Sequence, residues 1–399
     1  MMDAGIITQT LNYVFPNDAH AHWTLMIVIY PYITGVVAGA FIVSALAHVF
    51  KVKSLMPIAK FALIFALSWL LFVTAPLLNH LGHPERAFNM LFTPNFTGPS
   101  MMSGFGYIYI SYSILLIFEI LFIYRYEMIL LKEKSTGFKK KIYNILTLGT
   151  NDKSIEGRKL DHKIAFVLAA IGIPLACSLH GYVGFIFGAV KTVEWWFTPL
   201  MPIIFLLSAS VSGIAGMILF YILIKKITGK MHEIKTETIK TLIKLLWAFF
   251  ILDFLFEMIE IAVHAYGGTE GWHHVSSALN GPLSWSFWTM QVEILSIIPF
   301  FILMFLSLKN VSRNVLLIGG SIVSFMLLAQ VLFMRWNVVI GGQIMAKSER
   351  GFATYHPLWF EKEGILVTII MLVAPLITLW LLSKIFPLWE SECDKEKLH

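Results

Sequence analysis

Three carboxylates and an imidazole lie within one strongly apolar segment, residues 241–265. They are Asp253, Glu257, Glu260 and His264. Their spacings of four, three and four residues place them on one face of a helix, along a stripe about 16 Å long. Each ionisable group inside a membrane costs about 2.5–3.5 kcal/mol, so the stripe must face a bundle interior or a water-filled cavity rather than lipid.

Close carboxylates with an imidazole at the end of the row can hold and pass protons. Asp253, Glu257 and His264 are therefore the candidate catalytic residues, as a chain that exchanges protons with a ligand. The other interpretation is structural, in which the same groups form a buried hydrogen-bonded cluster that joins helices. The spacing alone leaves both interpretations open.

Further polar groups are expected at the outer end of this stripe. They come from four other segments, and the candidate ligand-binding residues among them are His83, Arg86, Tyr107, His180 and Arg335. A single histidine in such a place is more often structural. Many polar groups at one depth, contributed by different helices, favour a binding site.

Two carboxylates are expected deeper in the membrane. Glu119 lies below a row of hydroxyl side chains that begins at Tyr107, and Glu293 lies in segment 285–308. Such a row could carry protons across the membrane. Serine and tyrosine in membrane helices also bond simply to neighbouring helices, so the row has two possible meanings.

The elements that position these residues are apolar helices. Hydrophobic residues make up 57% of the 399 and charged residues only 14%, against about 25% charged residues in a typical soluble domain. Stretches of about 20 apolar residues, long enough to cross a bilayer, occur nine times, at 23–50, 56–78, 104–126, 164–187, 199–224, 241–265, 285–308, 314–336 and 365–387. The sequence predicts an all-α, polytopic protein of about nine membrane spans, with ten also possible.

Basic residues in the loops predict the orientation. With the N-terminus outside, the inner loops and tail hold 23 lysines and arginines and the outer loops hold five. This bias follows the positive-inside rule, so we expect a multi-pass protein of the cell membrane with an outer N-terminus and a cytoplasmic C-terminus. It also explains the net charge of +6 without a nucleic-acid partner.

The predicted spans divide the chain at a basic segment. The divisions are an extracytoplasmic N-terminus (1–22), spans one to three (23–126), a solvated cytoplasmic linker (127–163), spans four to six (164–265), spans seven to nine (285–387) and a cytoplasmic tail (388–399). We expect spans two to five and six to nine to form two four-helix bundles, with the first span packed outside them. The two cysteines, Cys177 and Cys393, are too few and too far apart for a metal site, an iron–sulfur cluster or a disulfide framework.

Several blocks resemble one family of membrane subunits. Residues 79–89 (NHLGHPERAFN), followed by TPNFTGPSM, resemble the NrfD and PsrC subunits, which carry Leu-Gly-x-Pro-x-Arg-x-x-Asn after an early span. Residues 180–184 (HGYVG) and 195–209 (WWFTPLMPIIFLLSA) resemble that family's next block. Residues 335–343 (RWNVVIGGQ) are similar to the sulfite-reduction-associated and HybB-like members. His80 stands where family members often have an acidic residue.

The resemblance implies a membrane subunit of a multi-subunit respiratory oxidoreductase. Such a subunit has no haem or iron–sulfur cluster of its own and binds menaquinone or ubiquinone near the outer face. Its partner is an extracytoplasmic, four-cluster ferredoxin-like iron–sulfur subunit. On this interpretation His180 would bond the quinone headgroup, and Arg86 and Arg335 would shape the site electrostatically.

Two other functions fit parts of the sequence. A haem b cytochrome needs two neutral imidazoles on facing helices, and His180 with His264 is one possible pair. A transporter or ion channel would use Asp253 and Glu293 near the middle of the membrane.

Overall fold

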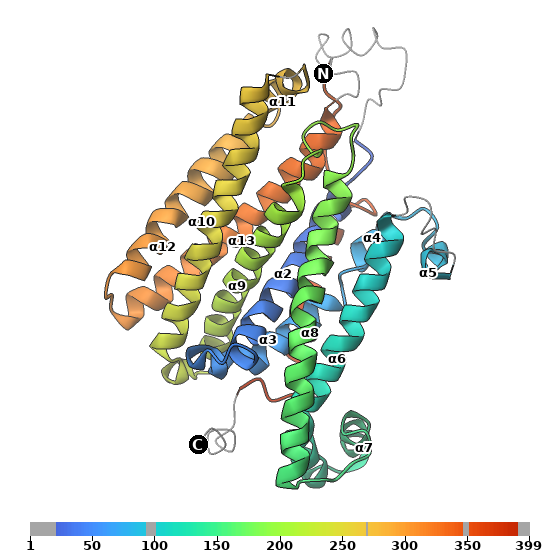
Figure 1. Ribbon diagram of the computed structural model, residues 1–399, viewed down its shortest axis with the longest axis vertical. Helices are drawn as coiled ribbons and strands as arrows, with labels where there is room; N and C mark the ends of the chain where they lie inside the picture. Colours follow the sequence, from blue (N-terminus) through green and yellow to red (C-terminus); the bar gives the residue numbers. More distant parts are fainter. Residues whose placement is uncertain (1–20, 93–100, 269, 346–350, 390–399) are drawn as a thin grey trace.

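The computed structural model describes residues 21–92, 101–268, 270–345 and 351–389, and this part of the chain is helical with no β-strand. Long helices run side by side over the length of the molecule (Figure 1). The prediction of an all-α, polytopic membrane protein is confirmed. Most of the predicted N-terminus and tail, including His20 and Cys393, lies outside the described residues.

The helices follow one another with short connections. In chain order they are α2 (Leu25–His48), η1 (Lys53–Leu55), α3 (Met56–Leu70), α4 (Ala75–His80), η2 (Pro84–Arg86), α5 (Asn89–Phe92), α6 (Met101–Lys134), α7 (Gly137–Leu146), α8 (Ile155–Gly188), α9 (Met201–Ile227), η3 (Met231–Glu233), α10 (Thr236–Gly267), α11 (Glu270–Asn280), η4 (Trp285–Ile297), α12 (Ile298–Leu308), α13 (Arg313–Ile344) and α14 (Ile365–Leu382).

Every predicted span coincides with helix. Within the described residues, seven stretches are long and apolar enough to cross a membrane, by length and composition: α2, Lys53–His80, α8, α9, Trp285–Leu308, α13 and α14. The other two predicted spans are the 34-residue α6, which packs on α8, and the 32-residue α10, which packs on α9.

The position of the first span differs from the expectation. We expected it outside the bundles, but α2 is a central helix that packs against α3, α8, α9 and α13. Its sequence is apolar on all sides, as a fully buried helix requires, and small residues let its backbone approach α9. A Cβ on Gly39 would collide with the Ala209 carbonyl, and one on Gly213 would collide with the Gly39 backbone. The expectation of a peripheral first span was therefore wrong.

The last span occupies the periphery instead. α14 packs against α3 and α2, and many of its large apolar side chains are exposed, as suits a lipid-facing helix. α9 packs against α2 and α8 on one side and against α10 and α13 on the other. The two halves of the molecule therefore share α9 rather than forming two separate four-helix bundles.

The basic segment 127–163 is largely helical. α6 continues to Lys134, and α8 begins at Ile155 after Ser154, whose hydroxyl accepts a hydrogen bond from the Gly157 amide at 2.9 Å. An ion pair between Arg125 and Asp161 ties α6 to α8 below the membrane spans. The segment predicted as a solvated linker thus extends two spans and adds α7 between them.

The seventh span begins as a π-helix. η4 runs for 13 residues with π geometry and continues as α12, where Pro299 is the second residue. π-Helical turns are rare and occur often at functional sites, because they change which side chains share a face. In this protein the π-helix determines which way Ser286 and Gln291 point.

Candidate functional site

The three carboxylates of α10 are buried, as their spacing predicted. Asp253 is fully buried, and Glu257 and Glu260 are each 6% exposed. His264 lies one turn further out and is partly exposed. The face defined by the spacing is therefore the face that α10 turns toward the protein, and its outer end reaches the surface of the bundle.

A row of hydrogen-bonded side chains, two amides and one hydroxyl, ends at Glu257 of this stripe. The Gln291 amide donates to Glu257 Oε2 at 3.0 Å and accepts from the Asn337 amide at 2.7 Å. The Asn337 carbonyl oxygen accepts from the Ser286 hydroxyl at 2.6 Å. Each amide has one donor and one acceptor side, so this order fixes the orientation of the whole chain. Glu257 Oε2 is an acceptor in it.

The π-helix explains how two residues of η4 reach Asn337. Ser286 and Gln291 are five residues apart, which is one hydrogen-bonded step of a π-helix. On an α-helix at about 100° per residue they would point about 140° apart. Glu293, which we expected to be buried, lies on the exposed side of the same helix. That expectation was wrong because it rested only on the position of Glu293 within a predicted span: two residues from the buried Gln291, Glu293 lies on the opposite face of an α-helix and of a π-helix alike.

A small cavity adjoins the carboxylates. Its lining includes Glu257, Glu260, Gln291, Asn337 and Trp195. Its volume is about 20 Å³, which is enough for one or two water molecules. Glu257 Oε1 makes no well-formed hydrogen bond to a described residue. The carboxylate is therefore held through Oε2, and the side chain of Gln330 on α13 is a further polar neighbour of it.

A second buried cluster surrounds Arg335 on α13. The guanidinium is fully buried, and its Nη2 donates to His180 Nε2 at 3.0 Å and to Ser208 Oγ at 2.6 Å. The guanidinium also lies 3.7 Å from the centre of the Phe205 ring. Because His180 Nε2 accepts a hydrogen bond, the neutral imidazole carries its proton on Nδ1. That nitrogen is buried and makes no well-formed hydrogen bond within the described part of the chain.

The two clusters meet at one stretch of α13. Arg335 belongs to the second cluster and Asn337 to the first, and the charge of Arg335 interacts with both Asp253 and Glu257. A cation that interacts with two buried carboxylates offsets part of the cost of burying them. The sequence predicted His180, Arg335, Asp253 and Glu257 separately, and the structure brings these four together.

Glycines at fixed positions make the clusters possible. A Cβ on Gly35 of α2 would lie 3.2 Å from His180 Cε1, so α2 packs directly on the imidazole. A Cβ on Gly342 would overlap the Trp196 indole, whose Nε1 donates to the Val338 carbonyl at 2.6 Å. Gly341 has Trp195 and Leu283 as neighbours in the same way. These glycines let tryptophans from the α8–α9 connection pack against α13.

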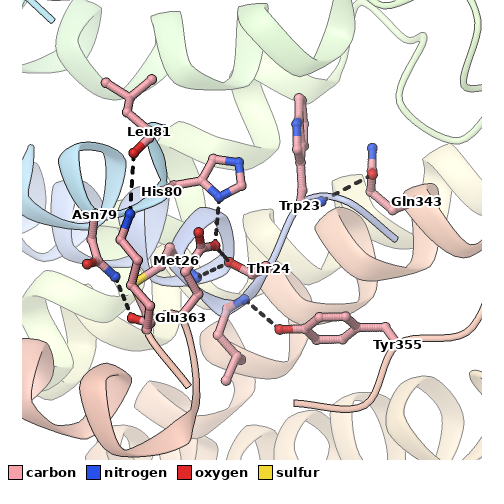
Figure 2. Close-up of polar contacts among 11 residues, drawn as sticks. Trp23, Thr24, Met26, Asn79, His80, Leu81, Gln343, Tyr355 and Glu363 are labelled. Carbon is pink, nitrogen blue, oxygen red and sulfur yellow. Dashed lines mark hydrogen bonds and ion pairs between the residues drawn. The ribbon is translucent and has the colours of Figure 1, made fainter. Parts of the chain in front are cut away.

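An outer clasp joins three distant segments (Figure 2). His80 Nδ1 lies 2.7 Å from Glu363 Oε2, and Thr24 donates to the same carboxylate. The Asn79 amide donates to the Lys362 carbonyl at 2.7 Å. Glu363 thus brings a carboxylate beside His80 from 283 residues away.

The clasp connects to the buried clusters through aromatic side chains. The Leu25 amide donates to the Tyr355 hydroxyl at 2.9 Å, which holds the start of α2 against the loop before α14 (Figure 2). The Trp23 ring stacks on Trp196 at 5.1 Å with an angle of 13°. Trp196 in turn bonds to α13 beside Asn337. The clasp therefore fixes the outer edge of the site.

Other candidate residues lie elsewhere. His83 and Arg86 are exposed in and beside η2, where His83 pairs with Glu85 at 2.9 Å, so they stand outside the buried clusters. Tyr107 donates to the Leu91 carbonyl at 2.5 Å and ties α6 to α5. Glu119 is fully buried in α6. Sequence reasoning missed Ser208, Ser286, Gln330 (a neighbour of Glu257) and Glu363 as members of the buried clusters or the clasp, because polar residues of these kinds are common in membrane helices and loops.

α11 also carries a buried histidine. His274 of α11 stacks on the Phe352 ring, with a centroid distance of 5.1 Å and an angle of 2°. Burial lowers the pKa of His274 below its ordinary value of about 6.5, so the neutral ring is favoured in the folded protein. Over the ranges described, no group of three or more histidines, cysteines and carboxylates could hold a metal ion.

Comparison with known proteins identifies similar chains. The family model described as polysulphide reductase, NrfD, matches residues 15–347. A selenate reductase subunit of Mesobacillus selenatarsenatis is 30% identical over 377 residues, which cover 89% of this chain and 84% of that protein. A putative membrane subunit of a dimethyl sulfoxide reductase of Halobacterium salinarum is 25% identical over 225 residues, covering 56% of this chain and 47% of that protein.

Proposed function

This chain belongs to the NrfD polysulphide reductase family, and from that premise we propose that it is the quinone-interacting membrane subunit of a respiratory oxidoreductase. Its similarity to two subunits named as parts of reductases supports a place in a multi-subunit complex. We propose that electrons pass between the quinone and an extracytoplasmic iron–sulfur partner. Menaquinone and ubiquinone are both suitable substrates.

One observation carries the proposal: buried hydrogen-bonding groups and buried proton-exchanging groups meet at residues 334–338 of α13. A quinone ring has two carbonyl oxygens that need donors, and its reduction to the quinol takes up two electrons and two protons. His180 Nδ1–H and the Arg335 guanidinium are donors of the kind required. Glu257 and Glu260, which line the neighbouring cavity, are groups that can take or give the two protons.

The roles follow from the hydrogen bonds. Arg335 fixes the His180 tautomer by donating to Nε2, so His180 presents its Nδ1–H to a carbonyl oxygen. Gln291 holds Glu257 through Oε2 and leaves Oε1 toward the proton path. His264, at the outer end of the stripe, would pass protons to the surface. During quinol oxidation the two protons leave along the stripe and the two electrons leave to the partner; reduction runs in reverse.

The cavity of about 20 Å³ is smaller than a quinone ring. A headgroup would therefore enter by displacing aromatic side chains at the cavity edge, and Trp195 and Phe287 are the two that line it. Their rings lie 6.0 Å apart in an edge-to-face contact, and both side chains are buried, so entry of the headgroup would have to separate them. The indole and phenyl rings would then pack on the faces of the bound ring.

The haem alternative agrees less well with the geometry. Axial ligation uses a free imidazole nitrogen, and His180 Nε2 is already the acceptor of the Arg335 hydrogen bond. A guanidinium this close to the ring would also repel an iron cation. The pair of His180 with His264 is therefore a poor haem site.

The proposal is tested with the complex purified from its native membrane. We expect oxidation of a soluble quinol analogue to drive turnover, and His180→Gln to lower that turnover at least about tenfold, as for loss of a positioned catalytic group. The matched control is His232→Gln, because His232 is exposed in η3, at the end of the bundle opposite α11. A complex that transfers electrons to or from the iron–sulfur partner but never to or from a quinone would contradict the proposal.

A further inference from the structure

α7 is a short helix outside the membrane spans with one apolar and one basic surface. It lies at the end of the bundle opposite α11, where it packs against α6 (Figure 1). Tyr143 and Thr147 form its buried side, and the Tyr143 hydroxyl bonds to the Ile385 carbonyl at 3.4 Å. The helix is thus fixed to the protein by one face and turns its other faces outward.

The outward apolar side chains are large and well exposed. Phe138 is 77% exposed and Ile145 is 73% exposed; they are seven residues apart and so lie on the same face, two turns from each other. Leu148, just beyond the helix, is 59% exposed and has a φ of +52°. A leucine in the left-handed region is strained by about 1–3 kcal/mol, so the chain holds an apolar side chain outward at a cost.

Three consecutive lysines accompany these apolar residues. Lys139, Lys140 and Lys141 are exposed, and no acidic residue occurs between 137 and 148. Nearby, Lys153 is paired with Glu133. The three lysines of α7 make no ion pair in the described ranges. Their charge is available to a partner.

The start of α8, at the same end of the bundle, carries similar exposed side chains. Ile155 is 70% exposed and Leu160 is 54% exposed, and both belong to a helix whose later turns face lipid. Lys159 and Lys163 are exposed among them. Apolar and basic side chains, with one exposed acidic residue, Glu156, among them, are therefore interleaved at the start of α8; apolar and basic residues side by side are typical of a helix in the headgroup region of a membrane.

We propose that α7 lies in the membrane interface and binds anionic phospholipid headgroups. Lys139, Lys140 and Lys141 contact the phosphates, while Phe138, Ile145 and Leu148 enter the boundary of the acyl chains. Lysines close to an anionic surface strengthen binding about fivefold each, so the three together contribute about a hundredfold. An acidic protein would satisfy the lysines but leave three large apolar side chains in water, which is why lipid is the better occupant.

The depth of α7 in a bilayer tests the proposal. Cys177 and Cys393 are replaced by serine, a single cysteine is introduced by Ile145→Cys, and a nitroxide is attached in the intact complex. The complex is placed in phosphatidylcholine vesicles with or without phosphatidylglycerol. With phosphatidylglycerol we expect the nitroxide to collide readily with oxygen and rarely with a water-soluble nickel chelate. A label introduced by Lys140→Cys should collide with the chelate.

Charge variants separate the possible occupants. Changing Lys139, Lys140 and Lys141 together to glutamine should return the label at position 145 toward water in anionic vesicles. The control changes Lys226, Lys235 and Lys244, which are exposed elsewhere at this end of the bundle, and should leave the depth unchanged.

Three results would overturn the proposal. The first is a label at position 145 that is equally accessible to the chelate in both kinds of vesicle. The second is shielding that is the same in both kinds and is lost when residues 390–399, which carry four acidic residues, are deleted. The third is shielding that requires another protein of the complex rather than phosphatidylglycerol.

Discussion

Glu257→Gln separates a proton-exchanging role from a structural one. The Gln291 amide donates to Glu257 Oε2 at 3.0 Å, and a glutamine carbonyl at position 257 can accept that same bond. The replacement has the same shape, and it removes an ionisable group from a buried position. We therefore expect the variant to assemble and to unfold within about 1 kcal/mol of the unchanged protein, the value of one net hydrogen bond.

Turnover should respond very differently from stability. A glutamine at position 257 can no longer accept or release a proton through Oε1, and removal of a positioned proton-transfer group typically slows a reaction by a factor of about 10²–10⁴. We expect quinol-linked turnover to fall at least about tenfold, with a changed dependence on pH. Glu257→Leu, in contrast, leaves the Gln291 amide buried without its acceptor and should cost about 1–3 kcal/mol in addition.

The assay compares purified complexes for assembly, thermal unfolding and steady-state quinol turnover between acid and alkaline pH. Glu119→Gln is the matched control, because Glu119 is also a fully buried carboxylate but lies on α6. Glu119→Gln should leave quinol-linked turnover largely intact. If a proton conduit crosses the membrane at Glu119, the variant would lose charge translocation alone. Full activity of Glu257→Gln with an unchanged pH profile would mean that the carboxylates of α10 merely hold the bundle together.

Three further outcomes are expected. An impermeant maleimide applied to intact cells should label a cysteine at position 273 and not one at position 140, because the charge bias places His273 outside and Lys140 inside; the reverse pattern would overturn the orientation. The isolated protein should absorb in the ultraviolet through its aromatic side chains and show no absorbance at visible wavelengths. Stoichiometric haem or iron in the isolated protein would contradict this. Burial lowers the pKa of His274, so the stability it contributes is complete above about pH 6.5 and is lost as the pH falls from there toward the lower folded pKa. The melting temperature of His274→Phe should therefore fall less between neutral and acid pH than that of the unchanged protein, and an identical fall in both would refute the reasoning.

The sequence predicted features that depend on local periodicity. The nine apolar stretches could be located because a bilayer requires about 20 apolar residues for each crossing. The buried face of α10 could be located because Asp253, Glu257 and Glu260 recur at helical spacing. The glycines of α2 and the all-round apolar character of that helix were also visible, and they could have indicated a central position rather than a peripheral one.

The remaining features depend on contacts between distant segments. The shared face of Ser286 and Gln291 follows from a π-helix, which no apolar pattern reveals. The pairing of His80 with Glu363 joins residues that are 283 positions apart. The sequence placed His83 and Arg86 in the loop after the second span, but it could not say that they lie outside the buried clusters.

The location of the bound quinone tests the central proposal most directly. A quinone analogue with a photoreactive group on its ring is bound to the intact complex, irradiated, and traced by mass spectrometry of the peptides. We predict labelling of this chain within residues 195–204 or 334–338, competed by unmodified quinone and reduced by His180→Gln. Competed labelling confined to another protein of the complex, or to parts of this chain away from α8, α9, α10 and α13, would contradict it.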